Sequence, residues 1–368
     1  MSLVPAVPWD PTVWAAAVAA VDRVTDYRVE AVTGTGESLG DVPVDGVRVS
    51  YDGDQAEAWR ADFALSDPSM VPQSSGDVLD GRSGTRLRVW WRLLTPQGWM
   101  ETPCGTFVVE DPRIHDGGTL GITVAGRDPL AVARRGGYGP AVIPVGGLTV
   151  PDALAALFGA VAPGMPLSIE PSTETVPPVL DLWERDPATD WTDIAAAAGM
   201  RVRTDRWGTI NVAADPDPAV VAADWQEGSS CPVTDLDVEI NTSTIPRRVV
   251  VISSSPEVRP PVSGAWENPD ADSQRLTTEM RIQSPTAQTA AACEAQARLT
   301  GERWRRPQQA VKVTVPARPD LNYRTPVLLR RTKAAVAGTF QVAGWDLVCA
   351  GRDADPAAMT VRMMTRAL

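Results

Sequence analysis

A short stretch of mixed secondary structure divides the chain, and it constrains the fold more than any other feature. Residues 183–212 read WERDPATDWTDIAAAAGMRVRTDRWGTINV. Asp190 or Thr192 is expected to cap a short helix, because a side-chain oxygen there accepts a free backbone N–H of the first turn. Gly199 fits the left-handed position just beyond a helix end. Two strands joined by a tight turn at 205–208 are expected to follow.

The segment before this unit, residues 25–130, is predicted to be a β domain. Its clearest strand is Arg86–Leu93, in which an apolar face alternates with an arginine-rich face at period two. Thr95–Gly98 is a turn with proline at its favoured second position. Short strands joined by such turns are typical of a small barrel or sandwich, and we expect a first β-barrel domain here. Residues 131–148 are rich in glycine and proline and are predicted to be a linker.

An apolar helix is expected before the first β domain, within residues 1–24. Asp10 is a suitable N-cap for a helix over residues 9–22, and Pro11 suits the first helical position. The helix is apolar on nearly all sides around Trp14. Such a helix must be covered either by its own chain or by a partner, and the sequence leaves both open.

The region around the mixed unit, residues 149–232, is predicted to be a small αβ domain. Its first helix, Asp152–Phe158, is expected to end at Gly159. Residues 233–368 are predicted to be a second β-barrel domain that contains a long alanine-rich helix over 285–304. The expected fold class is therefore mainly β with an α+β insertion, in which two small β-barrel domains are separated by a small αβ domain.

Two neighbouring stretches of the second β block differ sharply in composition. Arg248–Ile252 is rich in β-branched residues and is expected to be a buried strand. Residues 253–275 are polar and rich in proline, and they are expected to form an exposed loop.

A short phrase occurs once in each β block. Gly105–Val109 reads GTFVV, and Gly338–Val342 reads GTFQV. In both places a Gly-Thr-Phe strand is followed by a turn and then by an alternating strand. The phrase is a hint that the two β blocks are related barrels.

The charge of the chain indicates a protein partner rather than a nucleic acid. The 368 residues have a formal net charge of −12, which argues against specific nucleic-acid recognition. Residues 298–333 hold ten Lys or Arg and two Asp or Glu, so this stretch carries +8 and the rest −20. Such asymmetry favours a complementary interface. No segment reaches the roughly 18–20 apolar residues that span a bilayer, and the absence of a signal-peptide pattern predicts synthesis in a cytoplasm.

Little in the sequence points to catalysis. His115 is the only histidine, so triad chemistry would depend on it alone, and a surface position beside the following turn explains it more simply. Glu184 with Asp186, and Asp190 with Asp193, offer the residue types of a glycosidase pair. Helix capping and solvation explain these acids more simply. We therefore assign no catalytic residue and expect no enzyme.

Metal, cofactor and ligand sites are not indicated either, and we assign none. Asn268–Asp272 has carboxylates at calcium-like spacing but lacks the central glycine and closing glutamate of an EF-hand loop. Trp90 and Trp91, with arginines around them, have the residue types that stack on bases or sugars. A strand with one packed face and one interface face explains them better. The four cysteines lack a Cys-X-X-Cys motif and are expected to be buried or half-buried free thiols: Cys104, Cys231, Cys293 and Cys349.

Phrases in a recognisable order run along most of the chain. Those of the first β block are Asp41–Gly46, Asp67-Pro68, Arg86–Trp91, Gly105–Glu110 and Ala125–Asp128. Those of the αβ unit are Trp191–Ala195, Gly199 and Thr204–Gly208. Those of the second block are Asp237–Asn241, Arg248–Val251, Val315-Pro316 and Gly338–Val342, with the alanine-rich helix between them. In this order they resemble the baseplate-hub or tail-tip proteins of tailed phages and the related hubs of contractile injection systems. The composition resembles that of proteins from high-GC genomes, as in an actinobacterial phage or a prophage-derived particle.

The resemblance implies a structural virion protein of the phage tail tip. Such hubs are homotrimers in which two barrels per chain give a ring with pseudo-sixfold symmetry, joining a hexameric tail tube to a threefold spike or fibre. The expected partners are other copies of the chain, the tail tube or distal tail protein, the tape-measure protein, and spike or tail-fibre proteins. A needle, lysozyme or receptor-binding part, if present, is expected on a separate chain.

Other functions remain open at this point. The hub of a phage-derived contractile injection system is an alternative within the same class. A tail-borne cell-wall hydrolase would need a carboxylate pair such as Glu184 and Asp186. A carbohydrate-binding module would need an exposed tryptophan such as Trp90.

Overall fold

The chain is mainly β, as the sequence predicts. The structure is a computed structural model, and it describes residues 11–20, 23–110, 112–118, 120–136, 143–176, 187–216, 220–228, 231–241, 245–255, 258–273, 275–284, 287, 289–304, 308–349 and 358–365. The helices are α1 (Pro11–Ala19), α2 (Pro129–Gly136), α3 (Val150–Val161), α4 (Pro187–Ala197) and α5 (Ala290–Trp304).

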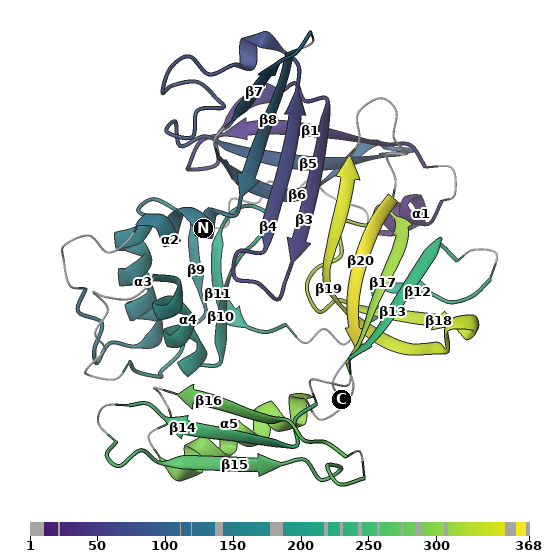
Figure 1. Ribbon diagram of the computed structural model, residues 1–368. Helices are drawn as coiled ribbons and strands as arrows, with labels where there is room; N and C mark the ends of the chain where they lie inside the picture. Colours follow the sequence, from purple (N-terminus) through teal and green to yellow (C-terminus); the bar gives the residue numbers. More distant parts are fainter. Residues whose placement is uncertain are drawn as a thin grey trace.

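Most strands of the described chain belong to one 14-stranded sheet. From the first β block come β1 (Thr25–Val32), β2 (Ser38–Val42), β3 (Gly46–Asp52), β4 (Trp59–Leu65), β5 (Arg86–Thr95), β6 (Gly98–Val109), β7 (Arg113–Asp116) and β8 (Leu120–Arg127). From later in the chain come β12 (Ala223–Trp225), β13 (Asp235–Asn241), β17 (Gln308–Pro316), β18 (Pro326–Arg331), β19 (Val336–Cys349) and β20 (Ala358–Thr365). Their order is β13-β17-β20-β19-β3-β4-β8-β6-β5-β1-β2, with β18 and β12 beyond β19 and with β7 beside β8 (Figure 1).

The two β blocks were expected to close as separate barrels, and here the structure corrects the sequence. In the described residues they form one sheet that stays open, because β19 of the second block pairs antiparallel with β3 of the first. The ladder runs from Gly344 opposite Asp52 to Cys349 opposite Val47. Joining these two strands gives each of them a backbone hydrogen-bonding partner, which a free edge would lack.

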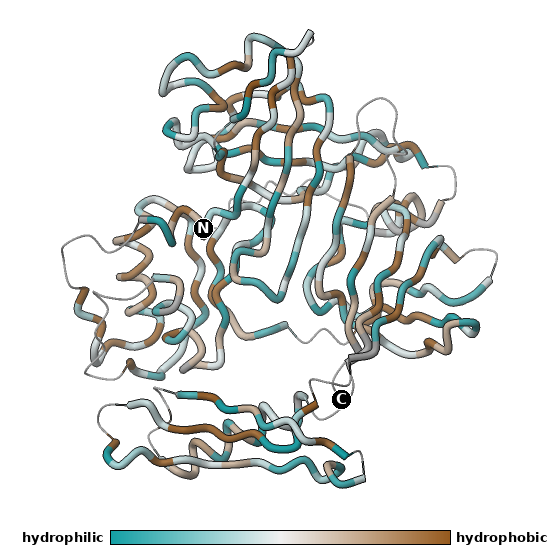
Figure 2. Tube along the Cα trace, viewed as in Figure 1, coloured by the Kyte–Doolittle hydropathy of each residue, from teal (hydrophilic) through white to brown (hydrophobic). Residues whose placement is uncertain are grey.

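An aromatic cluster fills the core under this junction. The ring centroids of Tyr51 and Trp59 lie 4.3 Å apart, and the ring centroid of Trp345 lies 5.7 Å from each of them. Trp345 donates its indole N–H to the Leu321 carbonyl at 3.1 Å, so its polar atom is satisfied inside the core. Apolar and polar residues alternate along these strands, which leaves one face of the sheet on the core and the other on solvent (Figure 2).

The αβ unit has its own core between helices α2, α3 and α4 and a small sheet. This sheet is β10-β11-β9, formed by β9 (Leu167–Ile169), β10 (Met200–Thr204) and β11 (Ile210–Ala214). The rings of Phe158 and Trp191 stack with centroids 5.1 Å apart. The predicted strand–turn–strand after Gly199 is present, and Asp205 closes its turn by accepting the N–H groups of Trp207 and Thr209.

Three local expectations for this unit are wrong. Helix α4 begins at Pro187, so Asp190 and Thr192 lie inside it rather than at its cap, and Thr192 donates its hydroxyl to the Ala188 carbonyl. Helix α3 continues past Gly159 to Val161, because its apolar face is held by packing. Helix α2 occupies the start of the segment that was predicted to be a linker, 131–148.

Gly199 gives a direct test of the local backbone. Its φ is +70°, and a Cβ added there would meet no atom within 4 Å. Replacement by valine is therefore expected to cost backbone strain alone, about 1–2 kcal/mol of unfolding free energy. Urea denaturation compared with the wild type measures this cost. A Gly199→Asn variant should lose less, because asparagine tolerates the left-handed region, and equal losses for both variants would contradict the explanation.

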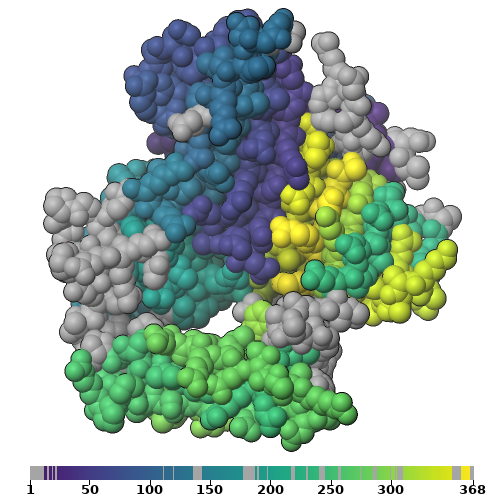
Figure 3. Space-filling model, viewed as in Figure 1, coloured from purple at the N-terminus to yellow at the C-terminus, as the bar shows by residue number. Residues whose placement is uncertain are grey.

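A third unit stands apart from the large sheet. Its strands are β14 (Arg248–Ser253), β15 (Ser263–Glu267) and β16 (Glu279–Ser284), in the order β15-β14-β16, and α5 covers one face. Figure 3 shows it as a light-green body below the rest of the molecule. Val249 and Val251 are buried as expected, but the predicted loop 253–275 contains strand β15. The predicted helix 285–304 is observed as α5 from residue 290.

The apolar N-terminal helix is covered by its own chain. Trp14 of α1 is 7% exposed and packs edge-on against Trp91 of β5, with ring centroids 5.7 Å apart. Among the described helices, none is long and apolar enough to cross a bilayer.

Candidate functional site

Both β blocks contribute strands to the solvent face of the large sheet. Where the blocks meet, its side chains are small or polar. Asp346 of β19 lies opposite Ser50 of β3 and accepts its hydroxyl hydrogen bond at 2.5 Å. Arg48 lies between Asp62 of β4 and Val348 of β19. A sheet face of this composition is suited to water or to a polar partner rather than to a covering apolar layer.

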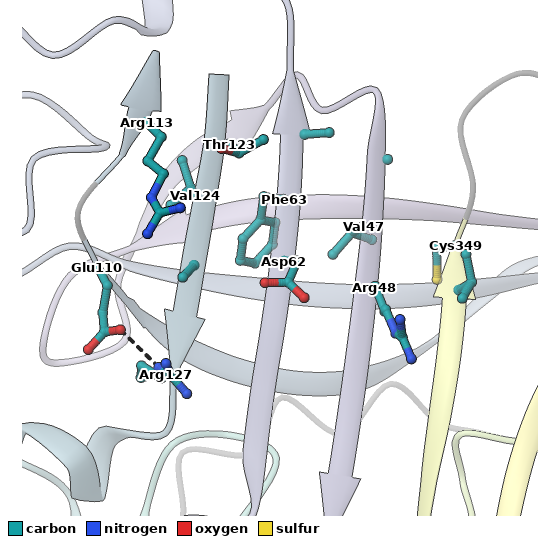
Figure 4. Close-up of a pocket in the computed structure, with 14 residues that line it drawn as sticks. Val47, Arg48, Asp62, Phe63, Glu110, Arg113, Thr123, Val124, Arg127 and Cys349 are labelled. Carbon is teal, nitrogen blue, oxygen red and sulfur yellow. Dashed lines mark hydrogen bonds and ion pairs between the residues drawn. The ribbon is translucent and has the colours of Figure 1, made fainter. Parts of the chain in front are cut away.

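A shallow hollow of about 690 Å³ lies on this face, over β3, β4, β8 and β19 (Figure 4). Phe63 and Val47 contribute to its floor, while Arg48, Asp62 and Arg113 line it with charges of both signs. Arg48 and Asp62 lie opposite each other on the solvent face. The adjacent Val47 and Phe63 are buried on the other face, because successive residues of a strand point to opposite faces. The hollow is broad and of mixed charge, which suits an extended surface contact better than the enclosure of a small molecule.

One ion-pair cluster fixes the wall of this hollow. Glu110 accepts hydrogen bonds from Arg127 at 2.8 Å and from Arg135 of α2. Burial alone would raise the pKa of Glu110, but the two arginines outweigh it and lower that pKa. The hydrogen bond to Glu110 raises the pKa of Arg127 in turn. Glu110 is therefore a positioned carboxylate and lacks the raised pKa of a general acid.

The sheet contains the same strand arrangement twice. The first copy runs β3-β4-β8-β6-β5, and the second runs β13-β17-β20-β19-β18. The phrases noted in the sequence fall at equivalent positions: Phe107 of β6 pairs with Leu87 of β5, and Phe340 of β19 pairs with Val327 of β18. The two β blocks are thus structural repeats of one unit.

The register of the repeats agrees residue by residue. Val108 opposite Arg127 corresponds to Gln341 opposite Met364. Further along, Arg113 opposite Thr123 corresponds to Asp346 opposite Thr360. Between these points the pairing register shifts by one residue in both ladders, between Val342 and Gly344 in the second repeat and between Val109 and Arg113 in the first. By the same correspondence Gly46–Asp52 of β3 matches Asp235–Asn241 of β13, as the pairings of these strands with β4 and β17 require.

The αβ unit is anchored to the first repeat by a buried carboxylate. Asp128, 1% exposed, follows β8 and accepts hydrogen bonds from the Trp59 N–H at 3.2 Å, the Leu130 N–H at 2.9 Å and the Thr204 hydroxyl at 2.5 Å. Burial raises its pKa to about 6, against the lowering effect of these three donors. The carboxylate thus joins β4, α2 and β10.

A second anchor joins the αβ unit to the second repeat. Tyr323 donates its hydroxyl to Asp54 at 2.9 Å and accepts a hydrogen bond from Arg201 at 3.1 Å. The guanidinium of Arg203 lies 4.3 Å from the Tyr323 ring centroid. Asp215 receives Arg203 and also Arg324, the latter at 2.7 Å. These contacts hold the αβ unit against the loop that precedes β18.

The described residues that were considered for catalysis lie in two different units of the fold. His115 is exposed on β7, whereas Asp190 and Asp193 lie on α4 of the αβ unit, and Asp190 is fully buried. Glu184 and Asp186 lie outside the described residues. In the described chain no three His, Cys, Asp or Glu side chains group as metal ligands do.

The remaining candidates have structural partners. Asn268, 3% exposed, accepts the Asp270 N–H and donates to the Pro246 carbonyl, so it shapes a turn. Trp91 is buried, as its strand pattern predicts. Trp90 donates to Glu30 at 2.9 Å and packs edge-on against Trp207 of the αβ turn, so this face of β5 is an internal interface. The cysteines are free, and three of the four are buried: Cys104, Cys293 and Cys349.

No protein-family model matches the chain, and no curated protein matches its sequence. Solved structures do share its fold. One is the tail protein from Neisseria meningitidis MC58, with 16% identity, a TM-score of 0.67, and coverage of 92% of this chain and 96% of that one. Another is the 43 kDa tail protein of prophage MuSo2 from Shewanella oneidensis, with 11% identity, a TM-score of 0.64, and coverage of 93% and 98%.

A third likeness extends to a secretion system. The Escherichia coli c3393 protein, described as a type VI secretion component similar to the T4 tail proteins gp27 and gp5, is 11% identical with a TM-score of 0.50. The match covers 94% of this chain and 75% of that protein. At these identities the likeness shows a shared fold, a phage-tail type, over nearly the whole of the present chain.

Proposed function

We propose that the chain is a structural protein of a phage-type tail, a hub component whose copies assemble into a ring at the tail tip. The observation that carries the proposal is the internal repeat. One chain supplies two equivalent five-strand arrangements joined edge to edge by β19 and β3. A chain built of two like units can match a sixfold tube with three copies, since three pairs of units give six positions.

The nature of the exposed sheet face supports this function. In a ring, the face that carries Arg48, Asp62 and Asp346 would line a central channel. Side chains of both signs and small size keep such a wall wet and open. The fold shared with a tail protein from Neisseria meningitidis and with a prophage tail protein from Shewanella oneidensis supports a tail role. The partners are then a tail-tube or distal tail protein on one side and a spike or fibre on the other, with the tape-measure protein in the channel and the virion tail tip as the location.

The assembled mass tests this proposal. One chain has a mass of 39.3 kDa, and we expect light scattering after size exclusion to give about three times that value. Averaged electron micrographs of the same peak should show a ring with six similar densities. A chain that stays monomeric at all concentrations and binds no tail-tube or tail-tip protein would contradict the proposal.

A further inference from the structure

Four strands of the large sheet have an outer edge that pairs with no other described strand: β2, β7, β12 and β13. Two of these edges belong to strands that have counterparts in the internal junction between β19 and β3. One is the outer edge of β7, whose other edge pairs with β8. The other is the outer edge of β13, which pairs only with β17. Figure 1 shows the two strands far apart, and the strands β17, β20, β19, β3, β4 and β8 lie between them in the sheet. Free edges of this kind readily accept a strand from another chain.

The chain itself shows which strand each edge fits. Within the chain, the end of β19 pairs with β3 and joins the second repeat to the first. By the register of the repeats, Arg113–Asp116 of β7 is the equivalent of residues 346–349 of β19, and β13 is the equivalent of β3. The two free edges are therefore equivalent to the two sides of the internal junction.

The register of the internal junction also predicts how the edges of β7 and β13 would pair with each other. Asp346 pairs with Ser50 and Val348 with Arg48 in the chain. Transferred to the free edges, the same spacing sets Arg113 opposite Glu239 and His115 opposite Asp237. On the core side it sets Ile114 opposite Val238.

The side chains at these positions are complementary. Arg113 and His115 are exposed on β7, and the outward residues of β13 are the carboxylates Asp237 and Glu239. Two apolar side chains, Ile114 and Val238, lie on the other face of these strands. Ile114 is 50% exposed and Val238 is half-buried, so both could be covered further by a partner strand. Opposite charges on one face and two apolar side chains on the other are the pairs that stabilise an antiparallel ladder.

There is also room for the incoming strand. A hollow of about 530 Å³, lined by Pro72, Arg82 and Pro112 among others, lies where the edge of β7 begins. In the transferred register the C-terminal end of β13 arrives there.

We propose that β7 of one copy pairs antiparallel with β13 of the next copy, with Arg113 opposite Glu239, so that the large sheet continues from chain to chain. The proposal rests on the ring proposed above and names the contact that closes it. The contact is head-to-tail, because a different surface of each copy takes part, and such contacts form closed rings when the rotation between copies allows it. The intermolecular junction then reproduces the internal junction between β3 and β19.

Disulfide trapping tests the register. Residues directly opposite in an antiparallel pair have Cβ atoms about 4.5–5.5 Å apart, within the reach of a disulfide after small adjustment. A chain carrying Arg113→Cys and Glu239→Cys should, on mild oxidation, give reducible dimers and trimers on a denaturing gel. The matched control carries Arg113→Cys and Asp235→Cys, which lie on the same face but four residues out of register, and it should not cross-link. Cys231 is half-buried and could itself form a disulfide with an added cysteine. Each variant with a single added cysteine measures how much cross-linking comes from Cys231.

A charge exchange tests the same contact without cysteine. Arg113→Glu or Glu239→Arg places like charges opposite each other and should weaken assembly at least about tenfold, as read from the concentration at which the mass falls to the monomer. The double variant restores an opposite pair and should assemble within about threefold of the wild type. Glu174→Arg, an equal change at an exposed carboxylate of the αβ unit, should assemble normally. Circular dichroism of each monomer checks that folding is unchanged.

The possible outcomes separate this proposal from the ring itself. If the wild type forms a ring but neither the cysteine pair cross-links nor the double variant recovers, the contact between β7 and β13 is wrong and the ring is held elsewhere. If the wild type never assembles, the proposed function fails and this contact fails with it. Cross-linking in the out-of-register control to the same extent as in the test pair would also overturn the register.

Discussion

Replacing Gly344 by alanine is expected to destabilise the protein by about 3 kcal/mol, because it forces apart the strands that join the two repeats. A Cβ at this position would lie 2.3 Å from the Tyr51 carbonyl oxygen and 3.2 Å from the Cα of Asp52. Both are backbone atoms of β3 held in the ladder with β19, so neither can turn away as a flexible side chain would.

A second effect of the same substitution acts through Arg362. Its guanidinium reaches from β20 across Gly344 to β3, donating to the Tyr51 carbonyl at 3.2 Å and to the Asp52 carboxylate at 3.1 Å. The added Cβ would stand 2.7 Å from the Arg362 guanidinium nitrogen. Glycine is needed here because the arginine passes over this residue to bind the next strand.

Urea denaturation followed by tryptophan fluorescence measures the loss, since Trp59 and Trp345 lie under the junction. Gly159→Ala is the matched control: it also adds one methyl group, but nothing lies within 4 Å of the new Cβ in α3, and a gain of about 0.5–1 kcal/mol is expected. Arg362→Ala should cost less than Gly344→Ala because it leaves the ladder unstrained. A Gly344→Ala variant with the wild-type midpoint would show that the two repeats are not held together by this ladder.

Local structure was well predicted where short-range chemistry decides it. The alternation of Arg86–Leu93 identified a strand with a buried face, and the structure confirms it. Gly199 and the turn closed by Asp205 were also predicted, because positive φ and side-chain capping of a turn leave a mark in the residue types themselves.

The joining of the two β blocks could not be read from the sequence. The strands β3 and β19 are separated by nearly 300 residues, and each would satisfy the same alternating pattern as an edge of its own barrel. The phrase shared by Gly105–Val109 and Gly338–Val342 did carry the information that the blocks are repeats. The phrase marks two equivalent strands, β6 and β19, which pair in the same way with β5 and β18. The polar and proline-rich composition of 253–275 concealed β15, a short strand of the third unit.

The surroundings of the candidate site residues also depend on long-range contacts that the sequence does not show. His115 stands out in the sequence as the only histidine, whereas its position on β7, a strand with one unpaired edge, is a matter of topology. In the sequence, Asp128 stands out only as the last residue of the phrase Ala125–Asp128 in the first β block. Its burial and its three donors depend on the αβ unit folding back onto the sheet, which no local pattern indicates.

Removing the Asp128 carboxylate is expected to cost most at low pH, the reverse of what an ion-paired surface carboxylate would do. Asp128→Ala leaves the Trp59 N–H, the Leu130 N–H and the Thr204 hydroxyl without their acceptor in a buried site. Unsatisfied buried donors cost about 1–3 kcal/mol each, and we expect a loss of about 4 kcal/mol near pH 4.

The dependence on pH follows from the raised pKa of this carboxyl. In the folded chain the pKa is about 6 because of burial, and in the unfolded chain it is near the ordinary value of 3.8. Between these values the folded form keeps a proton that the unfolded form has lost, so stability from this group is fully present below about pH 4 and falls as pH rises through 6. The decrease is about 3 kcal/mol, at 1.36 kcal/mol for each unit of pKa difference. The loss caused by Asp128→Ala should therefore shrink to about 1 kcal/mol above pH 7.

Unfolding free energies of the wild type and of each variant, measured at several pH values from 4 to 8, give this difference directly. Asp128→Asn is the matched control, because it removes the same titrating group and keeps the shape and one acceptor oxygen. Both variants should show the same change of the difference with pH while differing in absolute stability. Thr204→Val removes a donor that favours the ionised form of Asp128, so the pKa of Asp128 should rise further. In this variant the fall in stability with pH should therefore continue to a higher pH than in the wild type. If the stability difference between wild type and Asp128→Ala grew with pH, Asp128 would be a stabilised anion in the folded chain. The pKa of Asp128 would then be lowered by its three donors rather than raised by burial.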